Sequence, residues 1–153
     1  EIVGFGTTCD GTHITRPQSE TMRAAMQLAL KDAAISPDLI GHVNAHATAT
    51  RQGDIAESMA THEILGSQTP VSSYKGYLGH TLGACGALES FISVMMMNEE
   101  LFYPNLNLRD IDPQCAPLRY LTQPQEIKTD YVMNNNFAFG GVNTSLIFKK
   151  FID

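Results

Sequence analysis

The stretch S-S-Y-K-G-Y-L-G-H-T-L-G-A-C-G-A-L-E at residues 72–89 joins a short strand to a glycine-rich helix. Val71 to Ser73 is strand-like, and a single helix is predicted from about Gly79 to Asn98. Because this helix is apolar on nearly every side, we expect it to be buried all round. Gly79, Gly83 and Gly86 follow at spacings of four and three, and this stripe without side chains predicts the close approach of another backbone.

Before this stretch, strand-like runs alternate with helical patterns in which apolar residues recur at spacings of three and four. The predicted elements are a strand at 2–8, a loop at 9–17, a helix at about 20–34, a strand at 42–47 and a helix at about 53–66. Ser19 is the expected N-cap of the first helix. In the second helix, Asp54 and Glu57 form a D-x-x-E pattern, which is typical of a capping box.

After the stretch, residues 101–124 are punctuated by prolines and predicted to be irregular. Tyr131 to Ala138 and Val142 to Lys149 are strand-like and flank the residues F-G-G at 139–141, which indicates a hairpin. No repeat, low-complexity tract or linker divides the chain, so residues 1–153 are expected to form one unit. Strands that alternate with helices, followed by a hairpin, predict an α/β fold with a mixed sheet.

The composition argues against several functional classes. Ten Lys and Arg against 16 Asp and Glu give a net charge of −6, which would repel a phosphate backbone, so nucleic acid is not an expected partner. Leu88 to Met97, the longest strongly apolar stretch, is too short to span a membrane. The three cysteines form neither a disulfide framework nor a CxxC zinc motif, which predicts a reducing, cytoplasmic setting and no bound metal.

The start of the chain and its low charge content point to a larger protein. The sequence begins at Glu1, without a Met, directly in a strand-like run. Charged residues make up 17% of the chain, whereas roughly 25% is usual for a soluble domain. We therefore expect a fragment, or one half of a larger domain, with part of its surface covered by something outside it.

Ionisable residues stand beside small residues at the ends of three predicted strands, where α/β proteins commonly build ligand sites. His46 follows one strand and His80 another, although a single histidine at a strand end is more often structural. His80 is expected at the start of the glycine-rich helix, whose dipole favours the neutral ring. Glu89 lies within the apolar helix and needs a partner, for which Lys75 is the obvious candidate. On these grounds alone, a stabilising ion pair and a catalytic network are equally good interpretations.

Other catalytic motifs fail on spacing. His62-Glu63 would suggest a zinc-protease helix, but Gly66 stands where the second histidine is required. No glycine-rich phosphate loop and no G-x-S-x-G elbow occurs, and none of the cysteines lies in a loop beside a histidine. The 153 residues are therefore expected to carry no nucleophile of their own.

Taken together, three segments of the sequence resemble the C-terminal half of the β-ketoacyl-[acyl carrier protein] synthases, the condensing enzymes of fatty acid and polyketide synthesis. The segments are N-A-H-A-T-A-T at 44–50, the stretch at 72–89, and N-N-F-A-F-G-G-V-N at 135–143. The resemblance covers essentially the whole chain. It implies the C-terminal half of a thiolase-like layered fold, whose nucleophilic cysteine belongs to an N-terminal half that these residues do not include.

The resemblance also implies roles for individual residues. His46 and His80 match the two histidines that support decarboxylation of malonyl thioester and bind the enolate oxygen. Lys75 matches the lysine that orients the second histidine, and Glu89 matches the carboxylate that holds this lysine. These four residues are the expected catalytic set, and the chain alone is expected to be inactive.

Substrate-binding residues follow from the same resemblance. Thr48 and Thr50 match positions that hydrogen-bond the phosphopantetheine arm. Phe139 matches the aromatic gate between the acyl and malonyl sites, and its backbone N–H would belong to the acyl oxyanion hole. Phe137 is expected to line the same entrance, and Gly140 is counted with the gate. The arm would arrive on the acyl carrier protein, so no bound cofactor is implied.

The sequence departs from the family pattern at some positions and is compatible with other functions. Ala47 stands where the family usually has Gly, which would slightly alter the arm-binding loop, whereas Cys85 in place of Ala should be harmless. Thiolases are a poor match because their cysteine and N-E-A-F motif are missing. The expected partners are acyl carrier protein, the N-terminal half and a second copy in a homodimer. The alternatives are a non-catalytic partner resembling a chain-length factor, which would shape the acyl pocket in a heterodimer, and a folded remnant of proteolysis.

Overall fold

The computed structural model describes residues 1–12 and 15–151, which form a six-stranded mixed sheet and a separate two-stranded pair, β4-β6. The strands are β1 (Ile2–Cys9), β2 (Ile40–Asn44), β3 (Pro70–Ser72), β4 (Leu101–Phe102), β5 (Arg119–Tyr120), β6 (Gln125–Glu126), β7 (Tyr131–Phe137) and β8 (Val142–Lys149). The α-helices are α1 (Ser19–Ala33), α2 (Arg51–Leu65), α3 (Lys75–Leu78) and α4 (Cys85–Glu99), and the 3-10 turns are η1 (Pro37–Leu39), η2 (Leu82–Ala84) and η3 (Phe139–Gly141). The loop predicted at 9–17 contains residues 13 and 14, which lie outside the described residues.

The six-stranded sheet has the order β1-β8-β7-β2-β3-β5. β8 is antiparallel to both β1 and β7, whereas β2 is parallel to both β7 and β3. The β7–β8 pairing runs from Tyr131 opposite Lys149 to Phe137 opposite Asn143. The predicted α/β fold, with its mixed sheet and C-terminal hairpin, is therefore confirmed.

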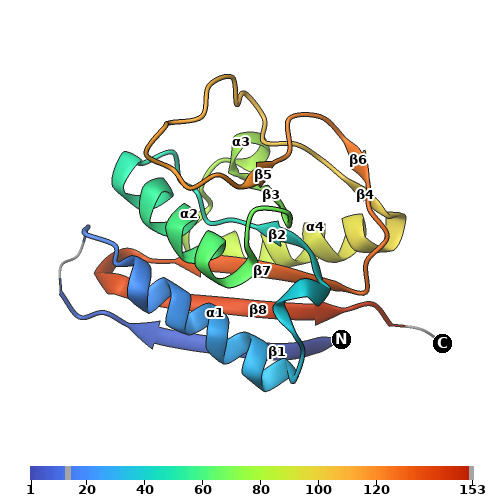
Figure 1. Ribbon diagram of the computed structural model, residues 1–153, viewed down its shortest axis with the longest axis horizontal. Coiled ribbons are helices and arrows are strands. Elements are labelled where there is room, and N and C mark those ends of the chain that lie inside the picture. Colours follow the sequence, from blue (N-terminus) through green and yellow to red (C-terminus); the bar gives the residue numbers. More distant parts are fainter. Residues whose placement is uncertain (13–14, 152–153) are drawn as a thin grey trace.

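Helices cover the two faces of the sheet differently (Figure 1). Met133 of β7 packs in one core cluster with Met22 and Met26 of α1, and this cluster also includes apolar residues of α2. Its neighbour Val132 packs in a second cluster with Met97 of α4. Since successive strand residues point to opposite faces, α1 and α2 lie on one face and α4 on the other.

The helix predicted from Gly79 to Asn98 is broken in the structure. α3 ends at Leu78, the turn η2 spans Leu82–Ala84, and α4 begins only at Cys85. The break has a backbone cause, because Gly79 has φ 74° and ψ 175° and Leu82 has φ 52°. Neither residue has the dihedral angles of a right-handed helix, so the helical hydrogen bonds cannot continue through them.

The expectation that this helix is buried all round is wrong for the described chain. Its buried residues are Cys85, Glu89, Ser93 and Met97, which form one stripe at a spacing of four. On the other side Phe91 is 65% exposed, and Leu88 and Met95 are also exposed. Within residues 1–12 and 15–151, no helix is long and apolar enough to cross a membrane.

The close backbone approach predicted for the glycine stripe occurs instead at β1. A Cβ at Gly6 would overlap the carbonyl oxygen of Ala25 and lie 2.7 Å from the amide nitrogen of Ala29, both in α1. At Gly86 a Cβ would meet the side-chain oxygen of Asn136, and at Gly83 it would meet no described atom within 4 Å. Glycine is therefore needed in β1 because α1 packs directly on this strand.

Both helix starts differ from the predicted caps. Ser19 is the first residue of α1, and the N-cap position is Gln18, which makes no side-chain cap bond. α2 begins at Arg51, earlier than expected, with Thr50 at its N-cap position. Glu57 therefore lies inside α2 and is not part of a capping box.

His42 of β2 is fully buried between two aromatic rings. Its ring centroid lies 4.5 Å from that of Phe102 and 6.1 Å from that of Tyr74, and its Nε2 lies 2.8 Å from the hydroxyl of Ser72. Burial lowers the pKa of His42 from 6.5 to about 3, because a charged imidazolium has no solvation there. The folded state therefore requires the neutral ring.

This requirement predicts a loss of stability in acid. Between pH 6.5 and about 3 the unfolded chain binds a proton at His42 that the folded chain does not. The stability due to neutral His42 is thus complete above pH 6.5 and falls as the pH falls. From pH 7 to pH 4 the wild type should lose about 3 kcal/mol more free energy of unfolding than His42→Gln. Denaturant unfolding at each pH measures this difference, and equal losses in the two proteins would contradict it.

Candidate active site

Three neighbouring strands end at the same edge of the sheet, and the predicted site residues follow their ends. His46 follows β2, His80 follows β3 and α3, and Phe137 is the last residue of β7. The rings of His46 and His80 are 5.3 Å apart between centroids and nearly perpendicular, at 88°. The ring of Phe137 lies 6.3 Å from that of His46. The fold therefore brings residues 46, 80 and 137 together, at the kind of strand edge where α/β proteins bind ligands.

A buried ion pair lies beside these rings. The Lys75 ammonium is 2.5 Å from a carboxylate oxygen of Glu89, and the two side chains are only 6% and 2% exposed. The other Glu89 oxygen accepts a hydrogen bond of 2.8 Å from the side-chain amide of Asn136. The predicted pairing of Lys75 with Glu89 is confirmed, and Asn136 is an additional partner that the sequence interpretation missed.

The surroundings of His80 differ from the expectation. His80 precedes the turn η2, and α4 begins five residues later at Cys85. Because the helix dipole acts within the first turn, the dipole of α4 does not act on this ring as the sequence predicted. Among the described residues, the ammonium of Lys75 forms its hydrogen bond with Glu89, and no hydrogen bond links it to His80. The orienting role of Lys75 therefore stays a prediction.

His46 is held as a neutral imidazole. Burial lowers the pKa of His46 to about 3, and the charges of Lys75 and His80 contribute in the same direction. Its Nδ1 is buried and has no hydrogen-bond partner among the described residues. A neutral imidazole carries one N–H donor. His46 can thus donate one hydrogen bond to an oxygen that becomes negatively charged.

Glu57 positions the His46 loop from inside α2. Its two carboxylate oxygens accept hydrogen bonds from the backbone N–H groups of His46 and Ala47, each at 2.8 Å. Burial raises the pKa of Glu57 to about 7, although these two bonds act in the opposite direction. The sequence interpretation missed this role. The role of Glu57 could have been predicted from its position in α2, because Glu57 lies on the same buried face of the helix as Ala60 and Thr61.

The loop between β2 and α2 carries the two predicted arm-binding residues. The hydroxyl oxygens of Thr48 and Thr50 lie 3.2 Å apart. Ala47 has φ 25° and Ala49 has φ 60°, in the left-handed region that favours glycine. A glycine at position 47 would adopt this backbone conformation without strain, whereas Ala47 adopts it with strain.

The hairpin turn separates the two predicted gate residues. Phe137 is 7% exposed and contacts His46, whereas Phe139 is 72% exposed. Gly140 has φ 79°, which suits glycine in this turn. The turn is tied to the end of β1, because the backbone N–H of Asp10 donates to the carbonyl of Gly141. Within the described part of the chain, no group of three His, Cys, Asp or Glu is arranged to hold a metal ion.

The layered sheet and the histidines at its strand ends place the chain in the thiolase-like class of α/β proteins. The family model described as "Beta-ketoacyl synthase, C-terminal domain" matches residues 1–109. The chain belongs to this family, as its sequence motifs predicted.

Relatives support the assignment over the whole chain. It is 38% identical to 3-oxoacyl-[acyl-carrier-protein] synthase 2 of Synechocystis, over 99% of this chain and 38% of the relative. A β-ketoacyl synthase structure from Burkholderia phymatum is 53% identical with a TM-score of 0.97, covering 99% of this chain and 37% of that one. A chain in the structure of a ketosynthase with its chain length factor from Xenorhabdus doucetiae is 39% identical with a TM-score of 0.90, covering 95% of this chain and 38% of that one. The chain thus spans 38% of the length of the Synechocystis relative.

Proposed function

We propose that the chain is the histidine-bearing half of a β-ketoacyl-[acyl carrier protein] synthase, which condenses malonyl thioester with an acyl chain in fatty acid or polyketide synthesis. The observation that carries this proposal is the perpendicular pair of His46 and His80, 5.3 Å apart, at the carboxyl ends of neighbouring strands. The buried pair of Lys75 and Glu89 lies beside them. The name of the Synechocystis relative specifies the same reaction class and the acyl carrier protein.

The proposed step is decarboxylation followed by carbon–carbon bond formation. The bond between the carboxylate and the α-carbon of the malonyl thioester breaks, CO₂ leaves, and the electron pair becomes an enolate on the thioester oxygen. The N–H groups of His46 and His80 donate hydrogen bonds to that oxygen and stabilise its charge. The α-carbon then attacks an acyl thioester on a cysteine outside these residues, and the cysteine thiolate leaves. The low pKa of His46 keeps its ring neutral, so the ring acts as a donor without a net charge.

Other residues near the two histidines would bind the substrate and admit it to the active site. Thr48 and Thr50 lie on the loop between β2 and α2 and would bind the phosphopantetheine arm of acyl carrier protein. Phe139 and Gly140 would form the gate between the acyl and malonyl sites, because a change in the rotamer of the Phe139 side chain moves a large volume. The exposed face of α4, with Phe91 at its centre, would be covered by the N-terminal half of the same protein. A second copy would complete a homodimer.

A variant series in the full-length protein tests this function. His46→Ala and His80→Ala should each slow malonyl decarboxylation about 100- to 1,000-fold, because each removes a donor to the enolate oxygen. His62→Ala is the matched control, since this histidine lies in the last turn of α2 and not at the strand ends. The rate of CO₂ release measures all three.

The same series tests a second candidate, a non-catalytic partner that shapes the acyl pocket. The Xenorhabdus structure supports this possibility, because it pairs a ketosynthase with a chain length factor. Such a partner would contribute no decarboxylation through His46 or His80. Unchanged CO₂ release in both variants would therefore reject the catalytic assignment and favour the partner.

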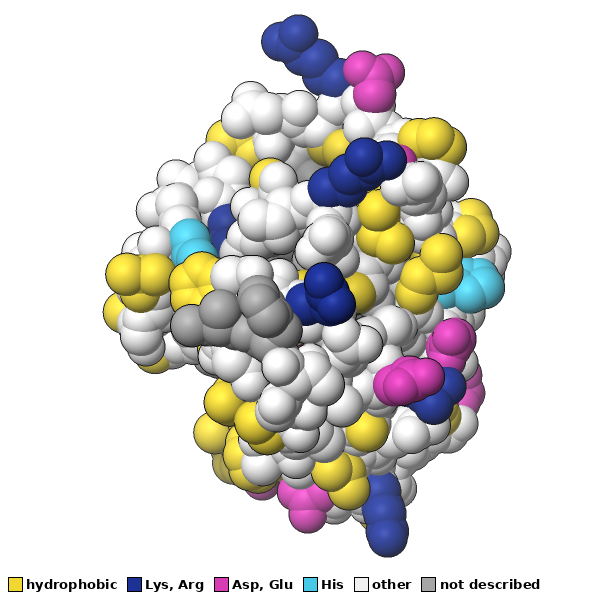
Figure 2. Space-filling view, turned by 90° about the vertical axis from the view of Figure 1, so that its left-hand side faces the viewer, with side chains coloured by type: hydrophobic (Ala, Val, Ile, Leu, Met, Phe, Trp, Pro, Cys, Tyr) yellow, Lys and Arg dark blue, Asp and Glu magenta, His cyan; other side chains and the backbone are white. Residues whose placement is uncertain are grey.

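Figure 2 views the end of the molecule where β7 ends, and a histidine lies among hydrophobic side chains there.

A further inference from the structure

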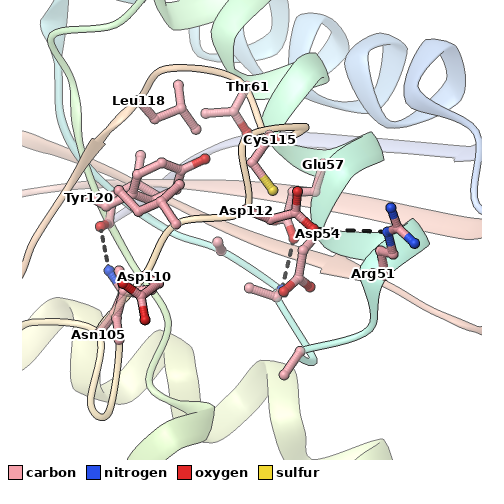
Figure 3. Close-up of a pocket in the computed structure, with 17 residues that line it drawn as sticks. Arg51, Asp54, Glu57, Thr61, Asn105, Asp110, Asp112, Cys115, Leu118 and Tyr120 are labelled. Atoms are coloured by element: carbon pink, nitrogen blue, oxygen red, sulfur yellow. Dashed lines mark hydrogen bonds and ion pairs between the residues drawn. The ribbon is translucent and has the colours of Figure 1, made fainter.

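A cavity of about 390 Å³ lies between α2 and the segment 105–120, behind the loop that carries His46 (Figure 3). Small-molecule sites in proteins begin at about this size. Apolar side chains make up much of the wall: Ala45, Ala47, Val71, Leu108, Ile111 and Leu118. The cavity can therefore enclose a short apolar body. Neither His46 nor His80 lines it, although Ala45 and Ala47 flank His46 in the chain.

The charged residues of the wall are mostly acidic. Carboxylates of Asp54, Glu57, Asp110 and Asp112 line the cavity, together with one cation, Arg51. The guanidinium of Arg51 is already engaged, at 3.9 Å from Asp112 and 3.0 Å from the side-chain oxygen of Gln114. One oxygen of Asp54 is buried and has no hydrogen-bond partner among the described residues. Burial raises the pKa of Asp54 and raises that of Glu57 to about 7, so Glu57 is only partly ionised at neutral pH. Four carboxyl groups against one guanidinium still leave an excess of negative charge, and one Asp54 oxygen is a free acceptor.

A second, independent observation is the hydroxyl of Thr61. Thr61 lines the cavity and is 1% exposed, yet its oxygen has no hydrogen-bond partner in the described structure. A buried hydroxyl without a partner destabilises the folded protein. An occupant of the cavity that carries N–H donors would satisfy the orphan atoms of Thr61 and Asp54.

We propose that this cavity is a binding site for a small organic cation, with an ammonium group on a short apolar body. The ammonium group would lie near Asp54 and Glu57, and the apolar body would contact Leu108, Ile111 and Leu118. An ammonium group supplies three N–H donors and one positive charge, which match the orphan acceptors and the negative charge. A neutral molecule of the same shape lacks both features.

The site is coupled to the active-site loop through one side chain. Glu57 lines the cavity and also accepts the backbone N–H groups of His46 and Ala47. A cation bound beside Glu57 would change the strength of these two hydrogen bonds. Occupancy would thereby bias the position of the His46 loop without direct contact with substrate.

Titration of the full-length protein with butylammonium and with 1-butanol tests the proposal. Saturation-transfer NMR should give a dissociation constant for butylammonium at least about tenfold lower than for 1-butanol, because only the cation pairs with the carboxylates. Equal binding of the two molecules would overturn the proposal, and this comparison needs no variant. Binding is read directly, so its failure would leave the proposed condensing activity untouched.

Variants then locate the bound cation. Asp54→Asn and Thr61→Val should each weaken butylammonium binding, the first more strongly because it removes a charge. Glu20→Gln is the matched control, since Glu20 is an exposed residue in the first turn of α1 and its loss should leave binding unchanged. Equal affinities in wild type and Asp54→Asn would place the cation elsewhere and overturn the assignment.

Discussion

Lys75→Met is expected to destabilise the protein by about 3–5 kcal/mol. The substitution keeps an apolar stem of similar length but removes the ammonium that lies 2.5 Å from Glu89. Glu89 is 2% exposed and would retain Asn136 as its side-chain hydrogen-bond partner. An isolated buried carboxylate is far more costly than a paired one. The free energy of denaturant unfolding measures the loss.

A second substitution separates the charge effect from a packing effect. In Lys75→Met combined with Glu89→Gln, the neutral amide oxygen at position 89 can still accept the bond from Asn136, and no buried charge remains. Most of the lost stability should return. If Lys75→Met alone unfolds within about 1 kcal/mol of the wild type, the pair is not a buried ion pair of the folded protein. If the double variant is stable but does not decarboxylate malonyl thioester, the pair of Lys75 and Glu89 has a functional role beyond stability.

Local patterns were sufficient to predict much of this architecture. The hairpin of β7 and β8 follows from two strand-like runs around F-G-G at 139–141, and the structure confirms it. α1 follows from apolar residues at spacings of three and four, which contact the sheet. The partner of Glu89 was predictable because a carboxylate in an apolar helix needs a cation, and Lys75 was the nearest candidate in a tight loop.

The errors arise where tertiary contacts or backbone dihedrals override the local pattern. The break before α4 depends on positive φ angles at Gly79 and Leu82, and nothing in the leucine side chain signals such a conformation. β2 ends at Asn44 and not at Ala47. The N–H of Ala45 still donates to Ser72 of β3, but those of His46 and Ala47 donate to Glu57, which holds the chain away from the sheet. A D-x-x-E pattern cannot reveal a contact formed across the loop.

The exposed face of α4 shows a different limit of prediction from sequence. Its apolar composition predicted burial on all sides, yet Phe91 is 65% exposed in the described chain. The apolar composition of a helix reflects all the surfaces that it contacts in the whole protein, whereas the structure contains only these residues. The proposed N-terminal half reconciles the two, since it would cover this face.

Gly6→Ala is expected to destabilise the protein by at least about 3 kcal/mol, at or beyond the upper end of the usual range for overpacking. The added Cβ would overlap the carbonyl oxygen of Ala25 and lie 2.7 Å from the amide nitrogen of Ala29. Both obstacles are backbone atoms of α1, which cannot rotate away as a side chain can. α1 must therefore shift away from β1, and a close-packed interior resists such a shift.

Thr7→Ala provides the matched control on the same strand. Thr7 is exposed on the face of β1 opposite to α1, so its truncation tests strand propensity without any clash and should change the stability by less than about 1 kcal/mol. Thermal unfolding of the two variants beside the wild type measures both effects. If Gly6→Ala unfolds at the same temperature as Thr7→Ala, α1 does not pack on β1 at the distance described. A large and selective loss at position 6 would instead show that the missing side chain, and not the flexibility of glycine, is what the fold requires there.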